Sequence, residues 1–165
     1  MERVKFEGDY ASTVFVKNLF LHNQKKKENL YLVIAKHDTN LDMKALTKHL
    51  KAASGTIRGG DEDVMFNLLG VKKGAVNLFA ILNDTGKKVN LIVDKNLWDD
   101  SLLVSFHPMQ NDASTSVSVA DIKKIIEASG HIPDIVDFSA IASTEEVKQA
   151  PPPKKKEEEK KQDVH

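Results

Sequence analysis

Short strand patterns alternate with short helix patterns along most of this chain, and turn residues separate them. The strand patterns cover residues 13–22, 31–35, 76–82, 89–93, 102–106, 114–117 and 132–138. The helix patterns cover residues 42–53, 61–69 and a third segment that ends at Gly130. Segment 76–82 is nearly all apolar, as expected of a strand buried on both faces, and polar turns join strands one to two and three to four as in hairpins. Hairpins interrupted by helices predict a mixed, mostly antiparallel α/β (α+β) domain rather than a doubly wound parallel sheet.

The composition changes abruptly near Ala150. Residues 151–165 begin with three prolines and continue as blocks of lysine and glutamate. A stretch with so little apolar surface to bury cannot offset the entropy it would lose on ordering. We therefore expect one domain over residues 1–142 and a disordered Pro/Lys/Glu-rich tail or linker over residues 143–165.

Charge, cysteine content and motifs narrow the class of protein. The 24 Lys and Arg balance the 24 Asp and Glu, so net charge alone does not predict a nucleic-acid partner. The chain has no cysteine, which excludes disulfides and thiolate zinc sites. The histidines are dispersed without metal-ligand spacing and no nucleotide-binding motif is present, so we expect no metal and no cofactor. No apolar run is long enough for a membrane span, and we expect a cytoplasmic protein without a membrane partner.

Two short segments carry the main candidate site residues. Lys17 and Asn18 interrupt an otherwise apolar strand pattern, and His107 ends another strand just before a proline and the polar residues Asn111 and Asp112. Polar groups in such places are costly unless they find partners, which favours a site where strand ends meet. The alternative interpretations are a solvent-facing edge-strand lysine and a hydrogen-bonded structural histidine. From the residues alone, these alternatives are favoured.

A glycine loop and a basic helix face are further candidates. The loop from Gly70 to Gly74, with Val71 inside it, allows backbone N–H groups to approach a ligand closely, although a plain connector is the simpler interpretation. Lys44, Lys48 and Lys51 lie at helical spacing on one side of the helix predicted over residues 42–53. Together with residues 25–27 they are candidates for binding RNA phosphates, the alternative being an ordinary solvated face.

Six segments, taken in order, carry a family resemblance. They are Lys17-Asn18-Leu19-Phe20-Leu21, Leu68-Leu69-Gly70-Val71 with Gly74, Leu82-Asn83-Asp84, Val93-Asp94-Lys95, Phe106-His107-Pro108 with Asn111-Asp112-Ala113, and Ile135-Val136-Asp137-Phe138. In this order they resemble the YbaK / prolyl-tRNA synthetase editing-domain family. Within it, the chain is most similar to the prolyl-tRNA synthetase-associated domains, which deacylate alanyl-tRNA(Pro).

The resemblance implies a barrel-like α/β fold with flanking helices and a metal-independent aminoacyl-tRNA deacylase. It implies that Lys17 lies near the aminoacyl ester, with Asn18 beside it, and that His107 lines a small amino-acid pocket. The loop residues Gly70, Val71 and Gly74, with Asn111 and Asp112, would bind the substrate. The partner implied is the acceptor end of tRNA(Pro), and the basic face Lys44, Lys48 and Lys51 found above is the candidate surface for contacting this RNA.

Two departures from the family and the tail suggest further expectations. Family members usually carry a helix and an extended segment before the Lys-Asn strand, where this chain has residues 1–12, and Lys73 stands where many relatives have proline. The tail suits a linker to the catalytic region of a prolyl-tRNA synthetase, as in the N-terminal region of a eukaryotic parasite synthetase. The alternative function is a catalytically silent module that binds tRNA or docks onto a synthetase.

Overall fold

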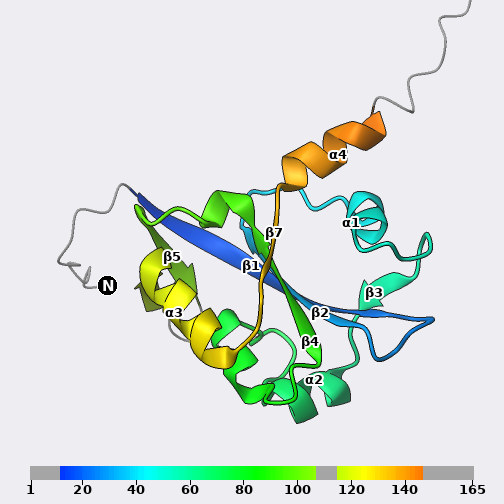
Figure 1. The fold of residues 1–165 in the computed structure, drawn as a ribbon, viewed down its shortest axis with the longest axis horizontal. Coiled ribbons are helices and arrows are strands. Elements are labelled where there is room, and N and C mark those ends of the chain that lie inside the picture. Colours follow the sequence, from blue (N-terminus) through cyan, green and yellow to red (C-terminus); the bar gives the residue numbers. More distant parts are fainter. Residues whose placement is uncertain (1–11, 107–114, 147–165) are drawn as a thin grey trace, which may run out of the picture.

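The computed structural model describes residues 12–106 and 115–146 (Figure 1). The strands are β1 (Ser12–Asn23), β2 (Leu30–Lys36), β3 (Ile57–Gly59), β4 (Val89–Asp94), β5 (Leu102–Phe106), β6 (Thr115–Ser118) and β7 (Asp134–Val136). The α-helices are α1 (Met43–His49), α2 (Glu62–Leu69), α3 (Val119–Ser129) and α4 (Phe138–Glu146), and two short 3₁₀ helices are η1 (Leu78–Asn83) and η2 (Lys95–Leu97).

β1 is the central strand of the sheet. β2 pairs antiparallel with it along one side, from Val16 to His22. Along its other side, β5 pairs in parallel with residues 12–15 and β3 pairs antiparallel with residues 21–23. The strand order is β6-β5-β1-β2-β4-β7, with β3 beside β1. Between the registers with β5 and β3, one edge of β1 has no strand partner among the described residues.

The expected strand pairing is only partly confirmed. The sheet is mixed, but the pairs β1–β2, β1–β3 and β5–β6 are antiparallel and the pairs β1–β5, β2–β4 and β4–β7 are parallel. The prediction of a mostly antiparallel sheet was therefore wrong, and so was the closed, barrel-like shape, because β6 and β7 are separate outer strands. One of the two expected hairpins, between residues 76–82 and 89–93, does not form. Instead β4 pairs in parallel with β2, and the connection between these two strands contains helices.

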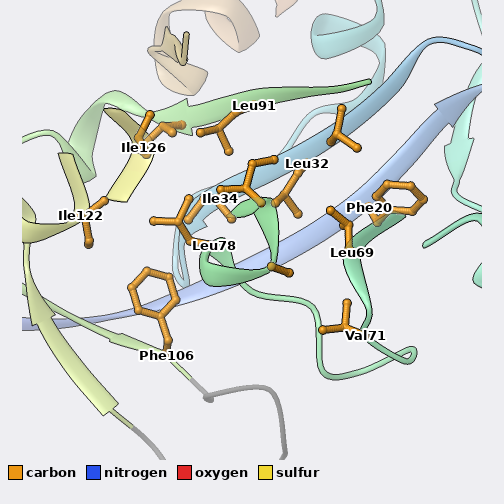
Figure 2. Close-up of a cluster of buried hydrophobic side chains, with 14 of the residues drawn as sticks. Phe20, Leu32, Ile34, Leu69, Val71, Leu78, Leu91, Phe106, Ile122 and Ile126 are labelled. Carbon is orange, nitrogen blue, oxygen red and sulfur yellow. The ribbon is translucent and has the colours of Figure 1, made fainter. Parts of the chain in front are cut away.

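Helices cover both faces of the sheet (Figure 1). One face packs against α2, α3 and η1 and forms the larger apolar cluster, in which Phe20, Leu32, Leu69, Leu78 and Ile122 are buried (Figure 2). The other face packs against α1 and α4 and forms a second cluster that includes Leu46 and Phe138. Since successive residues of a strand point to opposite faces, each residue of β1 faces one cluster or the other.

Local sequence signals explain where the helices begin and end. The side chains of Asp42, Asp61 and Ser118 accept hydrogen bonds from the first-turn amides of α1, α2 and α3, as N-cap residues do. Gly70 and Gly130 end α2 and α3 in the left-handed conformation that glycine adopts without strain. The helix predicted over residues 42–53 is shorter in the structure, because α1 ends at His49 and Lys51 adopts a φ of 54°.

The strand predicted over residues 76–82 is wrong. The segment forms η1, and the Asn77 side chain, fully buried, accepts a hydrogen bond from the Ala80 amide at its start. Leu78, Ala80 and Ile81 are buried while Leu82 is 46% exposed, which is a helical distribution and not the alternation of a strand. A short apolar run fits both structures, and here the capping asparagine favours the helix. As a result, β4 pairs in parallel with β2 and forms no hairpin with this segment.

The C-terminal part of the domain also differs from the expectation. The strand predicted over residues 132–138 is confined to β7, with Ile132 exposed before it, and Phe138 is the first residue of α4. The helix runs through Glu146. Residues 147–165, on which most of the tail prediction falls, lie outside the described residues.

Candidate functional site

A hollow lies beside the stretch of β1 that has no strand partner among the described residues. Its volume is ≈ 520 Å³, within the range of small-molecule sites. β1 contributes Val16, Asn18 and Phe20, α2 contributes Glu62 and Met65, and the loop that follows α2 contributes Lys73, Gly74 and Val76. The hollow is therefore a product of the sheet topology, because β5 and β3 pair with the two ends of β1 and leave its middle open.

Asn18 brings an unsatisfied acceptor to this hollow. Its register partner is Ile34, so its side chain lies on the α2 face of the sheet. The side-chain oxygen Oδ1 is buried and has no hydrogen-bond partner among residues 12–106 and 115–146. A buried polar atom without a partner costs about 1–3 kcal/mol. Because Asn18 lines the hollow, a donor bound there is a candidate partner for this atom.

Lys17 lies on the other face of the sheet. It is paired with Ala35, which belongs to the α1 and α4 cluster. Its Nζ donates a hydrogen bond of 2.5 Å to the carbonyl oxygen of Thr39, in the loop between β2 and α1. The structure thus does not bring the ammonium group of Lys17 and the amide group of Asn18 into one cavity, although the two residues are adjacent in sequence.

The loop that receives Lys17 is fixed by a buried carboxylate. Asp94 is fully buried, and its Oδ2 accepts hydrogen bonds from Thr39 Oγ1 at 2.6 Å and from the Lys36 amide at 3.1 Å. Its other oxygen, Oδ1, accepts a hydrogen bond from the Asn96 amide at 2.9 Å. Asp94 therefore ties the end of β2 and the loop after it to the end of β4, and through Thr39 it determines where Lys17 rests.

The glycine loop is divided between structural and cavity-lining positions. Gly70 ends α2, and the Leu69 carbonyl accepts a hydrogen bond of 2.8 Å from Asn83 Nδ2. Val71 is 3% exposed and belongs to the main apolar cluster. Gly74, with a φ of 86°, is the predicted loop glycine that lines the hollow. Gly70 and Val71 thus hold the loop in place, while Gly74 brings its backbone to the cavity.

Three predicted site residues fall in the segment after β5. His107, Asn111 and Asp112 lie outside the described residues. Phe106, at the end of β5, is buried in the main cluster and packs edge-on against Phe79 with the ring centroids 5.4 Å apart. The position of the histidine relative to the hollow therefore stays a prediction.

The three lysines of the predicted basic face lie near one another, but away from the hollow and with Lys51 beyond the end of α1. Lys44, Lys48 and Lys51 are exposed and line one shallow depression at α1. Lys51 also lines an adjoining depression with Lys25 and Lys26 of the turn after β1. Because α1 packs on the face opposite α2, an RNA bound at both places would have to pass around the edge of the sheet at β3.

A buried histidine–carboxylate pair was not predicted from the sequence. His131 Nε2 lies 2.9 Å from Asp84 Oδ2, and both side chains are almost completely buried. Asp84 also accepts hydrogen bonds from the amides of Lys88 and Val89. Burial by itself would raise the pKa of Asp84, but these hydrogen bonds and the one from His131 outweigh burial and hold the pKa below its usual value.

The same histidine contacts a serine, which gives the chemical elements of a Ser-His-Asp triad. His131 Nδ1 lies 3.0 Å from Ser129 Oγ. Ser129 Oγ, however, donates its hydrogen to the Ile126 carbonyl at 2.6 Å and also accepts from the His131 amide. This arrangement closes the end of α3 against the start of β4, and we interpret it as a structural lock and not as a nucleophile. The sequence offered no signal for it, because Asp84 and His131 are far apart along the chain.

The described residues also limit the chemistry of the hollow. No group of three or more His, Asp or Glu side chains capable of holding a metal ion occurs among residues 12–106 and 115–146. Within the same ranges, no helix is both long and apolar enough to cross a membrane. What the hollow offers is an apolar floor, an amide acceptor, a glycine backbone and two charged side chains at its rim.

Comparison with known proteins adds a family to this geometry. Residues 5–125 match the family model described as an aminoacyl-tRNA editing domain. The matched region contains β1, the hollow, the glycine loop and the Asp94 network.

Several relatives share most of their length with this chain. A prolyl-tRNA editing protein, ProX, from Acetoanaerobium sticklandii is 38% identical over 132 residues, which cover 79% of this chain and 76% of the relative. A putative prolyl-tRNA synthetase associated domain-containing protein 1 from Homo sapiens is 36% identical over 123 residues, covering 74% and 72%. A putative proline–tRNA ligase from Schizosaccharomyces pombe is 30% identical over 81 residues, which are 49% of this chain but 11% of that protein.

Proposed function

This chain belongs to the aminoacyl-tRNA editing domain family, and from that premise we propose that it hydrolyses alanine from mischarged alanyl-tRNA(Pro). The observation that carries the proposal is the hollow beside β1, lined by Asn18, whose buried Oδ1 has no partner in the part of the chain that the structure describes. Its volume suits the aminoacyl group together with the terminal nucleoside, and its acceptor suits a substrate or water that must be oriented by a hydrogen bond.

The choice of alanine follows from the limits of selection by size. A synthetase site shaped for proline cannot strongly reject a smaller amino acid, because each methylene group is worth only about 1–3 kcal/mol of discrimination. A second site that admits only small side chains removes the product of such errors. The relative named a prolyl-tRNA editing protein supports tRNA(Pro) as the RNA.

The proposed reaction is a direct hydrolysis. A water molecule attacks the carbonyl carbon of the ester, the bond between this carbon and the ribose oxygen breaks, and the proton lost by the water is transferred to that oxygen. The products are free alanine and a tRNA with a free terminal hydroxyl group. We assign Asn18 to orient a donor at the ester, Gly74 to approach it with its backbone, and His107 to line the pocket. The chemistry needs no protein nucleophile and, in our proposal, no metal.

Lys17 has less direct support as a site residue than Asn18 and Gly74, which line the hollow. Its ammonium group rests on the Thr39 carbonyl, on the face opposite the hollow. To stabilise the developing charge on the ester oxygen it would have to leave Thr39 and reach around the open edge of β1. One correctly placed donor of this kind is worth about 2.7–4 kcal/mol of transition-state stabilisation. The resting position also favours a second candidate function, a silent module that binds tRNA without hydrolysing it.

A single assay separates the two functions. Alanyl-tRNA(Pro) labelled on the amino acid is mixed with excess protein, with and without a chelator, and release of alanine is followed in a single turnover. Release at a rate well above spontaneous hydrolysis, unchanged by the chelator, supports the deacylase. Binding of the RNA without release supports the silent module, and loss of activity in the chelator contradicts metal independence.

The proposed RNA contacts and partner lie beyond the hollow. We assign the basic depression of Lys44, Lys48 and Lys51 to the tRNA backbone, because clustered lysines bind phosphates irrespective of sequence. We also propose that the C-terminal segment can link the domain to a prolyl-tRNA synthetase. The similarity to a short part of a much longer proline–tRNA ligase supports such an arrangement.

A further inference from the structure

The Phe20 ring lies so close to Gly60 that no side chain fits at position 60. A Cβ atom added to Gly60 would lie 2.2 Å from Phe20 Cδ1 and 2.5 Å from Cε1, well inside the normal separation of carbon atoms. The Gly60 amide donates a hydrogen bond of 2.8 Å to the Phe20 carbonyl, so the two backbones are held together. The φ angle of Gly60 is not positive. Glycine is therefore needed here for space and not for backbone conformation.

Phe20 is also part of the hollow. Phe20 and Met65 are 8% and 4% exposed and form an apolar floor, whereas Glu62 and Lys73 are exposed at the rim. An apolar amino-acid side chain is best accommodated at this floor, because the charged rim can remain hydrated. The position of the Phe20 ring then determines how much room the floor offers.

A side chain introduced at position 60 would push the Phe20 ring away, and the ring could move in only one direction. Behind it, Leu32 is its register partner in β2 and is completely buried, and Leu69 is packed in the same cluster (Figure 2). Such interiors are close-packed and yield little. Within the described part of the chain, the hollow is the side without packed atoms, so a displaced ring moves into it and reduces its volume.

We propose that the contact between Phe20 and Gly60 is a specificity determinant that sets the largest amino acid the hollow admits. The inference rests on the proposed function, since it assigns the amino-acid side chain of the ester to the floor of the hollow. It assigns two new roles: Phe20 is the wall that the substrate side chain meets, and Gly60 is the positioning residue that holds this wall back.

The experiment compares two esters of tRNA(Pro) that differ by one methylene group, alanyl and 2-aminobutyryl. Single-turnover rates are measured for the wild type, Gly60→Ala, Phe20→Leu and the double variant. Gly60→Ala should increase the preference for alanyl by about 10-fold or more, and Phe20→Leu should decrease it by a similar factor. In the Phe20→Leu background, the added methyl group meets no ring, and Gly60→Ala should change the preference by less than about threefold.

Melting temperatures test the contact without reference to catalysis. Gly60→Ala should lower the melting temperature by about 3–8 °C in the wild-type background and by much less in the Phe20→Leu background. Gly59→Ala is the matched control, because a Cβ at Gly59 meets nothing within 4 Å, and its melting temperature should stay close to that of the wild type.

The outcomes separate this inference from the function on which it rests. If the wild type hydrolyses alanyl-tRNA(Pro) but the preference does not respond to Gly60→Ala, or responds equally in both backgrounds, the inference is wrong and the function stands. If the wild type hydrolyses neither ester, both are wrong. Coupled melting temperatures with an unchanged preference would leave Phe20 and Gly60 as a packing pair only and would also overturn the inference.

Discussion

Two neighbouring residues of β1, Lys17 and Asn18, have opposite surroundings. Asn18 lines the hollow, and its buried side-chain oxygen has no partner within the described part of the chain, whereas Lys17 is held by the Thr39 carbonyl on the other face. Strand alternation dictates this separation, so the two side chains cannot both be catalytic in the resting arrangement. Replacement of each residue therefore reports on a different part of the proposed site.

Lys17→Ala should remove most of the deacylation and leave the fold intact. The hydrogen bond to Thr39 is partly buried, and its removal costs about 1 kcal/mol of stability, whereas removal of a charge at the ester costs at least tenfold in rate. Lys17→Arg should also be poor, because a planar guanidinium does not replace a compact ammonium group. The measurement is the single-turnover rate, with the circular dichroism spectrum as the control for folding. A rate within about threefold of the wild type would show that Lys17 acts only as a structural residue beside Asp94.

Asp84 offers a second prediction at the residue scale, one of stability and pH. Its pKa is lowered in the folded state, so its carboxylate contributes stability above its unfolded pKa of about 3.9, and this contribution is lost as the pH falls through the folded value. Asp84→Asn should lower the free energy of unfolding by about 1.5–3 kcal/mol at pH 7, because the buried charged acceptor of several hydrogen bonds becomes a neutral one. Urea unfolding at pH 7 and pH 3 should show the difference between the two proteins shrinking at the lower pH. A constant difference would mean that the carboxylate charge has no part in the lock.

At the scale of elements, the predictions from sequence succeeded where a signal was local. The helix caps Asp42, Asp61 and Ser118 and the stops at Gly70 and Gly130 are all visible in the sequence, and the helices begin and end near them. The segment 76–82 failed because an apolar run of that length fits a buried strand and a 3₁₀ helix equally well. The parallel pairing of β2 with β4 and the open edge of β1 depend on contacts between distant segments, which no local pattern encodes.

The same limit applies to the candidate site. The sequence singled out Asn18 and Gly74, because a polar residue in an apolar strand and a glycine in a short loop are unusual locally. It did not single out Gly60, whose importance comes from the position of the Phe20 ring across the β1–β3 pair. Nor did it show which of the two packed faces each of Lys17 and Asn18 occupies, which follows only when the register with β2 is known.

The basic depression at α1 gives a prediction for an element. Lys44→Ala and Lys48→Ala suit the helix, since alanine is the best helix former, and Lys51→Gly suits the positive φ of that position. The triple variant should bind tRNA(Pro) more weakly, and the slope of log affinity against log salt should flatten by up to about 0.7–0.9 for each phosphate that is no longer neutralised by a lysine. Fluorescence anisotropy at several salt concentrations measures both. Unchanged affinity and slope would identify the three lysines as an ordinary solvated face.

At the scale of the whole molecule, the two apolar clusters account for the stability of the domain. They pack both faces of one sheet between α2, α3 and η1 on one side and α1 and α4 on the other. The hollow, the Asp94 network and the basic depression all lie on elements that these clusters hold. The tail beyond Ala150 has almost no apolar residue to bury, and from this composition we expect it to add to neither cluster.

Truncation after Ala150 should therefore leave the melting temperature within about 2 °C of the full chain. Burial of apolar surface is the main source of stability, at about 25 cal/mol per Å², and residues 151–165 are chiefly proline, lysine and glutamate. Affinity for tRNA is a separate matter, because the tail carries a block of lysines that can bind phosphates even without a fixed structure. Scanning calorimetry and tRNA binding on the same two proteins distinguish these effects. A large drop in melting temperature would show that the tail packs on the domain, whereas a lower affinity with an unchanged melting temperature would make it an RNA-binding extension.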